Sequence, residues 1–138
     1  MDLKRYINAQ RTFYSIALAE IKSGRKRSHW MWFIFPQIHC LGSSRTSIYY
    51  AIKNIDEAQK YLQHQILGNR LLEISELLLH IEGNNATEFL GTPDDMKLRS
   101  SMTLFASLQN TAPVFEMVLK KFFNSERDTK TLEIIIRK

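Results

Sequence analysis

The chain has 138 residues, of which 44% are hydrophobic and 24% are charged. These values are typical of one globular domain and exclude a disordered or membrane-spanning chain. The longest uninterrupted apolar run covers residues 30–35, whereas a transmembrane helix needs about 20 residues. The N-terminus is polar, and the single cysteine, Cys40, is expected to be a small buried residue. The sequence thus predicts one domain over residues 1–138, in the cytoplasm and away from membranes.

The net charge of +5 is distributed unevenly along the chain. Residues 1–53 carry nine Lys or Arg against two acids, residues 54–94 carry two against seven, and residues 95–138 carry eight against five. The excess of cations in the first third favours an anionic ligand there. The charge also permits non-specific nucleic-acid binding, but no nucleic-acid motif supports it.

The first predicted element is an amphipathic helix over residues 3–21. Apolar side chains recur on one face at the helical period of about 3.6 residues, and Gly24 ends the helix. Gln10 falls in the middle of this face, so its amide should point inward. Because an unpaired buried amide costs about 1–3 kcal/mol, Gln10 either joins two elements or reaches a pocket.

The next segment, RKRSHWMWFIFPQ at residues 25–37, places three cations before a histidine and four large aromatic residues. Two interpretations are open. Apolar runs are usually buried, so the segment could be core behind a solvated basic loop. Alternatively, Trp30 or Trp32 could stack on the flat ring of an anion, with Gln37 as a hydrogen-bonding partner and His29 as an acid.

Two helices are predicted in the acidic middle of the chain, a short one from residue 55 and a longer one over residues 71–81. Asn54 is a typical N-cap, Gly68 could break the chain between the helices, and residues 83–85 end the second. Arg70 lies on the apolar side, where a cation needs a carboxylate partner or a ligand. His64 has no evident partner in the sequence.

The clearest helix start is at residues 92–95, with Thr92 as cap, Pro93 in the first position and two aspartates in the first turn. The polar face of this helix is formed by Asp95, Lys97, Arg99, Ser100 and Thr103. Such a face near a positive helix N-terminus can bind phosphate or sugar hydroxyls. Equally, Asp95 and Arg99 could form an ordinary surface pair.

The last predicted helices start at Pro113 and at Asp128, and residues 47–52 fit either a strand or a helical turn. The predicted fold is therefore mainly α. It is a compact single domain of about six helices with at most one short strand.

Two segments of the chain resemble the signatures of the domain of unknown function 1810 family, small and mainly bacterial proteins that carry the label calpastatin. These segments are SHWMWFIFPQ at residues 28–37 and PDDMKLRSSMTLF at residues 93–105. The likeness extends through Gln10, Tyr14 and residues 67–71 to nearly the whole chain. It implies a mostly helical domain and brings no established activity. More remotely, the layout resembles NADAR-type domains, which act on ADP-ribose conjugates.

Three functional hypotheses follow, namely a hydrolase of N-glycosidic ADP-ribose conjugates, a nucleotide-binding module without catalysis, and an interaction protein that uses the aromatic patch. For an ADP-ribose or NAD-derived ligand, Asp95 and His29 would act in catalysis. The predicted ligand-binding residues are Gln10, Trp30, Trp32, Gln37, Arg70, Lys97, Arg99, Ser100 and Thr103. The histidine spacing matches no metal site, so no metal and no cofactor are predicted.

Overall fold

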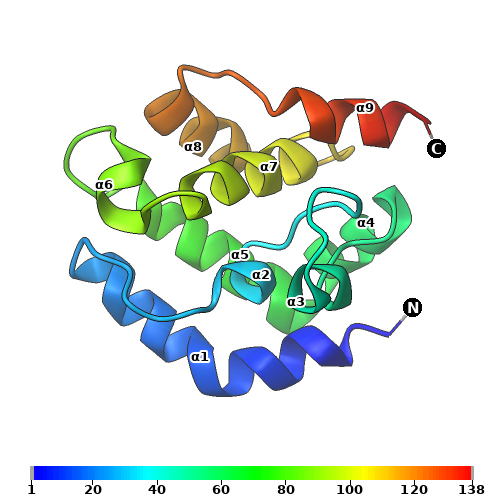
Figure 1. The fold of residues 1–138 in the computed structure, drawn as a ribbon, viewed down its shortest axis with the longest axis horizontal. Helices are drawn as coiled ribbons and strands as arrows, with labels where there is room; N and C mark the ends of the chain where they lie inside the picture. The colour runs from blue at the N-terminus through cyan, green and yellow to red at the C-terminus, as the bar shows by residue number, and fades with distance from the viewer. Residues whose placement is uncertain (1, 138) are drawn as a thin grey trace.

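A computed structural model describes residues 2–137, which are mostly helical (Figure 1). The helices are α1 (Lys4–Lys22), α2 (Met31–Ile34), α3 (Arg45–Tyr49), α4 (Ile55–Gln63), α5 (Gln65–Leu78), α6 (Ala86–Leu90), α7 (Asp94–Ala106), α8 (Pro113–Phe123) and α9 (Thr129–Arg137). The predicted mainly α fold class is confirmed. Helices α2 and α6 were not predicted, and α3 overlaps residues 47–52, for which a strand or a helical turn was expected. Each of the three has only four or five residues. None of the helices within the described residues is long and apolar enough to cross a membrane.

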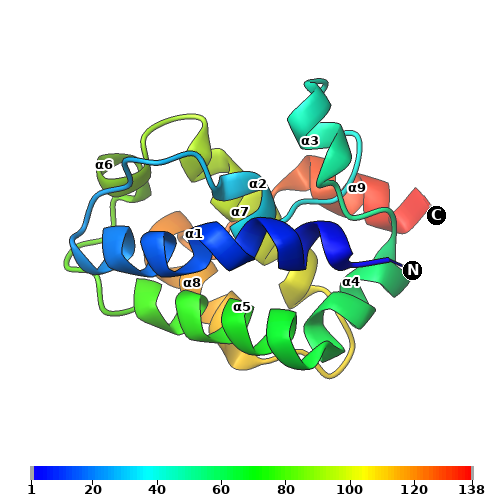
Figure 2. The same cartoon turned by 90° about the horizontal axis from the view of Figure 1, so that it is seen from below.

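Two long helices, α5 and α7, organise the packing. Helix α5 lies against α1, α4 and α8, whereas α7 lies against α2, α4, α6, α8 and α9. Helices α1 and α5 run alongside each other, and α3 projects from the body of the molecule (Figure 2). Near the base of α3, Ile38 and Ile52 form a parallel β-bridge, so the stretch 47–52 holds both a helical turn and an extended residue.

The break between α4 and α5 lies at His64 and not at Gly68. As predicted, the Asn54 side chain caps α4 by accepting a hydrogen bond from the Glu57 amide. His64 does the same for α5, because its Nδ1 accepts from the amides of Ile66 and Leu67 at 3.1 and 3.2 Å. Gly68 is inside α5, where a Cβ would lie 2.0 Å from the carbonyl oxygen of Leu62. It is a glycine because the two helices meet there backbone to backbone.

Other helix ends also differ from the prediction. Helix α5 ends at Leu78, well before residues 83–85, and α7 begins at Asp94 without a side-chain cap from Thr92. The predicted start of the last helix at Asp128 is confirmed. The Asp128 side chain caps α9, because its Oδ2 accepts hydrogen bonds from the amide and the hydroxyl of Thr131.

The aromatic segment is largely core. Trp30 and Phe35 are fully buried and Phe33 is 6% exposed, so the first interpretation of residues 25–37 holds for these rings. Cys40, in contrast, is exposed, and the expectation that it is buried was wrong. It lies in a surface turn with a φ of 69°, where its thiol is beyond the reach of the core.

Replacing Gly68 by alanine should lower the free energy of unfolding by at least about 2 kcal/mol, because the added methyl group meets a backbone carbonyl that cannot rotate away. Urea unfolding followed by circular dichroism measures this. The matched control is Asn69→Ala, an exposed neighbour in the same helix, which should change stability by less than about 0.5 kcal/mol. Equal stability of the two variants would contradict the close contact.

Candidate functional site

A buried carboxylate, Glu20 at the end of α1, fixes the loop that follows it. Glu20 Oε1 accepts from the amides of Arg27 and Ser28 and from Trp30 Nε1 at 2.8, 3.0 and 2.9 Å, and Oε2 accepts from the Ser28 hydroxyl at 2.5 Å. Burial by itself raises the pKa of Glu20, but these hydrogen bonds outweigh it and lower the pKa to about 2. The loop and Trp30 are thus held by a charged group that stays ionised.

Within this loop, Lys26 turns inward and joins the loop to α7. Its Nζ lies 2.8 Å from Asp94 Oδ2 and 5.1 Å from the ring centroid of Trp30. The other oxygen of Asp94 lies 3.2 Å from Lys97 Nζ, and this ammonium is 4.5 Å from the ring centroid of Trp32. Two lysines, one aspartate and two tryptophans therefore connect the two sequence signatures in space.

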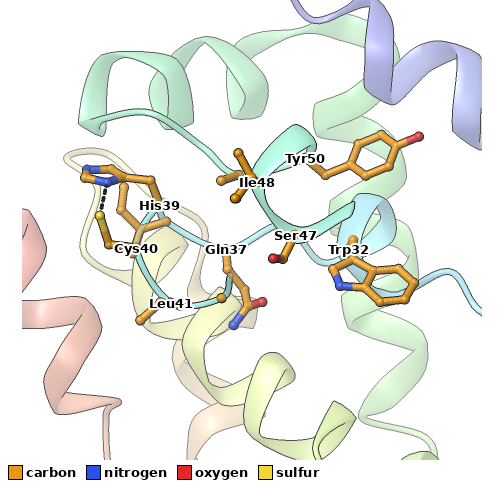
Figure 3. A pocket seen from close by; sticks show the side chains of 11 residues that line it. Trp32, Gln37, His39, Cys40, Leu41, Ser47, Ile48 and Tyr50 are labelled. Carbon is orange, nitrogen blue, oxygen red and sulfur yellow. Dashed lines mark hydrogen bonds between the residues drawn. The ribbon is translucent and has the colours of Figure 1, made fainter. Parts of the chain in front are cut away.

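Beside Trp32 lies a cavity of about 300 Å³, which we call the aromatic chamber (Figure 3). Its walls include Trp32, Ile38, Leu41, Ser47, Ile48 and Tyr50. The indole nitrogen of Trp32 points toward Ser47 and Gln37 (Figure 3). His39 and Cys40 are at the opposite end of the chamber, with Nδ1 and Sγ 2.9 Å apart. Burial raises the pKa of Tyr50, so its hydroxyl stays protonated at neutral pH.

A second cavity of about 300 Å³, the lysine chamber, adjoins the first. Its own walls include Pro93, Met96, Lys97, Ser100, Asp128 and Lys130. Gln37, Leu41, Gly42 and Ser47 line both chambers. Because Lys97 of the second chamber lies on the ring of Trp32 in the first, the two chambers form one groove with an aromatic end and a basic end.

Over residues 1–135 the sequence matches the family described as "Protein of unknown function (DUF1810)". The chain belongs to the DUF1810 family. A crystal structure of the conserved hypothetical protein Rv1873 from Mycobacterium tuberculosis has 44% sequence identity and a TM-score of 0.95, covering 98% of this chain and 96% of that one. No curated protein matches the sequence. The remote resemblance to NADAR-type domains gains no support from these matches.

In this DUF1810 chain, four of the predicted ligand-binding residues line the groove. They are Trp32, Gln37, Lys97 and Ser100. Trp30 does not join them, because its ring is fully buried and its nitrogen is taken by Glu20.

Gln10 and Arg70 form a separate interior network. Gln10 Nε2 donates to the Phe33 carbonyl and the Tyr61 hydroxyl at 2.8 and 2.9 Å, and its Oε1 accepts from Arg70 Nη1 at 3.4 Å. The Arg70 guanidinium also lies 5.1 Å from the ring centroid of Tyr14. The inward direction of Gln10 is confirmed, and of its two predicted roles the contacts favour the one that joins elements.

On α7, Arg99 and Thr103 hold the chain that precedes α9. Arg99 donates to the carbonyls of Glu126 and Arg127 at 3.0 Å each, and Thr103 Oγ1 accepts from the Asp128 amide at 3.0 Å. The predicted Asp95–Arg99 surface pair is absent among the ion pairs of residues 2–137.

The two predicted catalytic residues lie outside the groove. Asp95 accepts a hydrogen bond from the Thr87 hydroxyl at 2.6 Å and lines a different cavity, which it shares with Arg99. His29 is exposed and belongs to neither chamber. Within the described residues, no group of three or more His, Cys, Asp or Glu is placed to hold a metal ion.

Sequence reasoning missed several groove residues, among them Ser47, Tyr50, Asp128 and Lys130. They come from residues 47–52, which fitted either a strand or a helical turn, and from the start of the last predicted helix. Lys26 and Asp94 had a detectable signal, since a lysine beside tryptophans and an aspartate in a helix first turn are both common ion-pair partners.

Glu20→Gln should lower the free energy of unfolding by about 3 kcal/mol at neutral pH, since a carboxylate with four donors is lost. The pKa of Glu20 is lowered from 4.5 to about 2 on folding, so its contribution is present above pH 4.5 and is lost as the pH falls toward 2. The stability difference between the wild type and Glu20→Gln, measured by urea unfolding, should therefore shrink over this range.

The control for this measurement is Glu133→Gln, an exposed acid of α9, which should leave the pH dependence of stability unchanged. If the difference in free energy of unfolding between the wild type and Glu20→Gln stays constant from pH 6 to pH 3, the lowered pKa of Glu20 is contradicted.

Proposed function

We propose that the groove binds a small nucleotide-type anion, derived from ADP-ribose or NAD, with its ring in the aromatic chamber and its phosphate in the lysine chamber. The observation that carries this proposal is the contact between Lys97 and the ring of Trp32 at the junction of the chambers, 4.5 Å from Nζ to the centroid. A cation beside an aromatic ring suits a ligand in which a flat ring and an anion are close together.

The aromatic chamber supports the ring end of this ligand. Its volume of about 300 Å³ is within the usual range for small-molecule sites. Trp32 and Tyr50 are half-buried, so each ring is packed on the protein yet borders the cavity. The Gln37 amide makes no side-chain hydrogen bond to any described residue and is free to pair with a heterocycle.

The lysine chamber supports the anionic end. Lys97 has only 21% of its side chain exposed, so its charge acts in a medium of lower dielectric than water. Lys130 is an exposed second cation at the start of α9. Together they give a phosphate two partners on one side of the groove.

The proposal is limited to binding. The hydrolysis predicted from the sequence would need Asp95 and His29 at the ligand, and neither residue lines the groove. An interaction module that uses the aromatic patch is not favoured either, because Trp30, Phe33 and Phe35 are buried.

Thermal unfolding with ADP-ribose, NAD and simple nucleotides tests the proposal. A ligand at about 100 times its dissociation constant should stabilise the protein by about 2.7 kcal/mol and raise its melting temperature. Inorganic phosphate alone should have little effect, because it cannot occupy the aromatic chamber. If none of these nucleotides raises the melting temperature, the proposed function is wrong.

Lys97→Met should weaken nucleotide binding by at least about tenfold, because a charge-assisted hydrogen bond of about 1.5–3 kcal/mol is lost. Trp32→Ala should weaken it as well, by removing the ring surface. Isothermal titration calorimetry gives the affinities, with circular dichroism to show that each variant is folded. The control is Lys60→Met, an exposed lysine of α4, which should bind like the wild type. Loss of affinity in Lys60→Met equal to that in Lys97→Met would show that only overall charge matters.

A further inference from the structure

The positive charge of the lysine chamber is largely compensated by the protein itself. Lys97 shares Asp94 with Lys26, which is 7% exposed and lies against Trp30. Of the charged residues that line the chamber, Lys97 and Lys130 are opposed by one acid, Asp128. With the Lys26–Asp94 pair behind them counted as neutral, the chamber carries about one net positive charge.

The chamber also contains serine oxygens that can accept hydrogen bonds, which a sugar hydroxyl can donate and a phosphate chain cannot. The Ser100 hydroxyl donates its proton to the Met96 carbonyl at 3.1 Å, and the Ser47 hydroxyl donates to the Ser44 carbonyl at 2.9 Å. The Ser47 oxygen also accepts from the Ser44 hydroxyl at 3.0 Å. In this arrangement each hydroxyl has used its proton, and each oxygen keeps a lone pair that can accept from a ligand. A phosphate chain has only acceptor oxygens at neutral pH, whereas a sugar hydroxyl can donate to these serines.

Asp128 strengthens this preference because its carboxylate is fixed in place. Its Oδ2 accepts from the Thr131 amide at 2.9 Å and the Thr131 hydroxyl at 2.6 Å, and its own amide donates to Thr103 Oγ1. Its Oδ1 has no hydrogen bond from any described side chain. A fixed carboxylate accepts from hydroxyl groups and repels phosphate oxygens.

From this balance of charge and donors we infer that the groove selects a nucleotide with one terminal phosphate group, or with a diphosphate joined to a sugar at each end, over one that carries a free triphosphate chain. The inference rests on the proposed function, and it assigns the discriminating role to Asp128 and the acceptor oxygens of Ser47 and Ser100. Lys97 and Lys130 then pair with the phosphate group or the diphosphate linkage, and the sugar hydroxyls donate to the three acceptors. Asp128 disfavours the additional negative charge of a free triphosphate chain.

Calorimetric titrations of the full chain with AMP, ATP and tripolyphosphate at one ionic strength, without divalent cations, test the selectivity. AMP and ATP share the ring and the sugar, so they differ only in the phosphate chain. AMP should bind at least about tenfold more tightly than ATP, and tripolyphosphate more weakly than either. ATP binding as tightly as AMP would overturn the inference and leave the proposed function standing. No binding by either nucleotide would also overturn the inference, and titration with ADP-ribose and NAD then decides whether the proposed function stands.

Two variants assign the selectivity to its residues. Asp128→Asn keeps an oxygen that can cap α9 but removes the charge, so the preference for AMP over ATP should fall by about three- to tenfold. Ser100→Ala should weaken the binding of AMP several-fold and leave the affinity for tripolyphosphate unchanged. The control Glu133→Gln, an exposed acid of the same helix α9, should keep the wild-type preference. An unchanged preference in Asp128→Asn would overturn the inference.

Discussion

The path of the chain between α1 and α2 depends on one ionised carboxylate in the interior. A buried charge is costly unless its lone pairs are filled, and Glu20 fills them with four donors from the next turn of chain. The loop that supplies these donors is not helical, so its backbone amides at Arg27 and Ser28 bind the carboxylate in place of the carbonyl groups of a helix. Because Trp30 is one of the donors, the same interaction fixes where the aromatic segment enters the core.

The charge pattern of the sequence has a structural counterpart in the contact between the two signature segments. The basic first third and the acidic middle meet where Lys26 reaches Asp94, at the start of α7. Asp94 in turn holds Lys97 against Trp32. The signature residues Trp30, Asp94 and Lys97 thus take part in this junction, and only a minority of the signature residues line the groove. A signature shared by a family can therefore report on folding as much as on ligand binding.

The long helices could be predicted because their apolar faces repeat over several turns, as in α1, α5, α7 and α8. Helices α2, α3 and α6 are too short for any period to show, and His64 gave no sign that its ring nitrogen caps a helix. For the site, a polar residue looks the same in the sequence whether it joins elements or lines a cavity. Thr103 and Ser100 lie on one predicted polar face, yet Thr103 holds the chain before α9 and Ser100 lines the groove. Asp128 and Tyr50 were missed because the groove is built by packing between distant segments.

The parallel bridge between Ile38 and Ile52 brings together the two ends of a surface excursion that carries Gly42 and α3. Both bridge residues are buried, whereas none of the residues of α3 is. The excursion is therefore fastened at its base, and α3 at its far end contributes no buried residue to the core. Insertions, deletions and substitutions can accumulate there at little cost to folding. Since this excursion is the outer wall of the groove, relatives with the same core can evolve different ligand preferences by changing one loop.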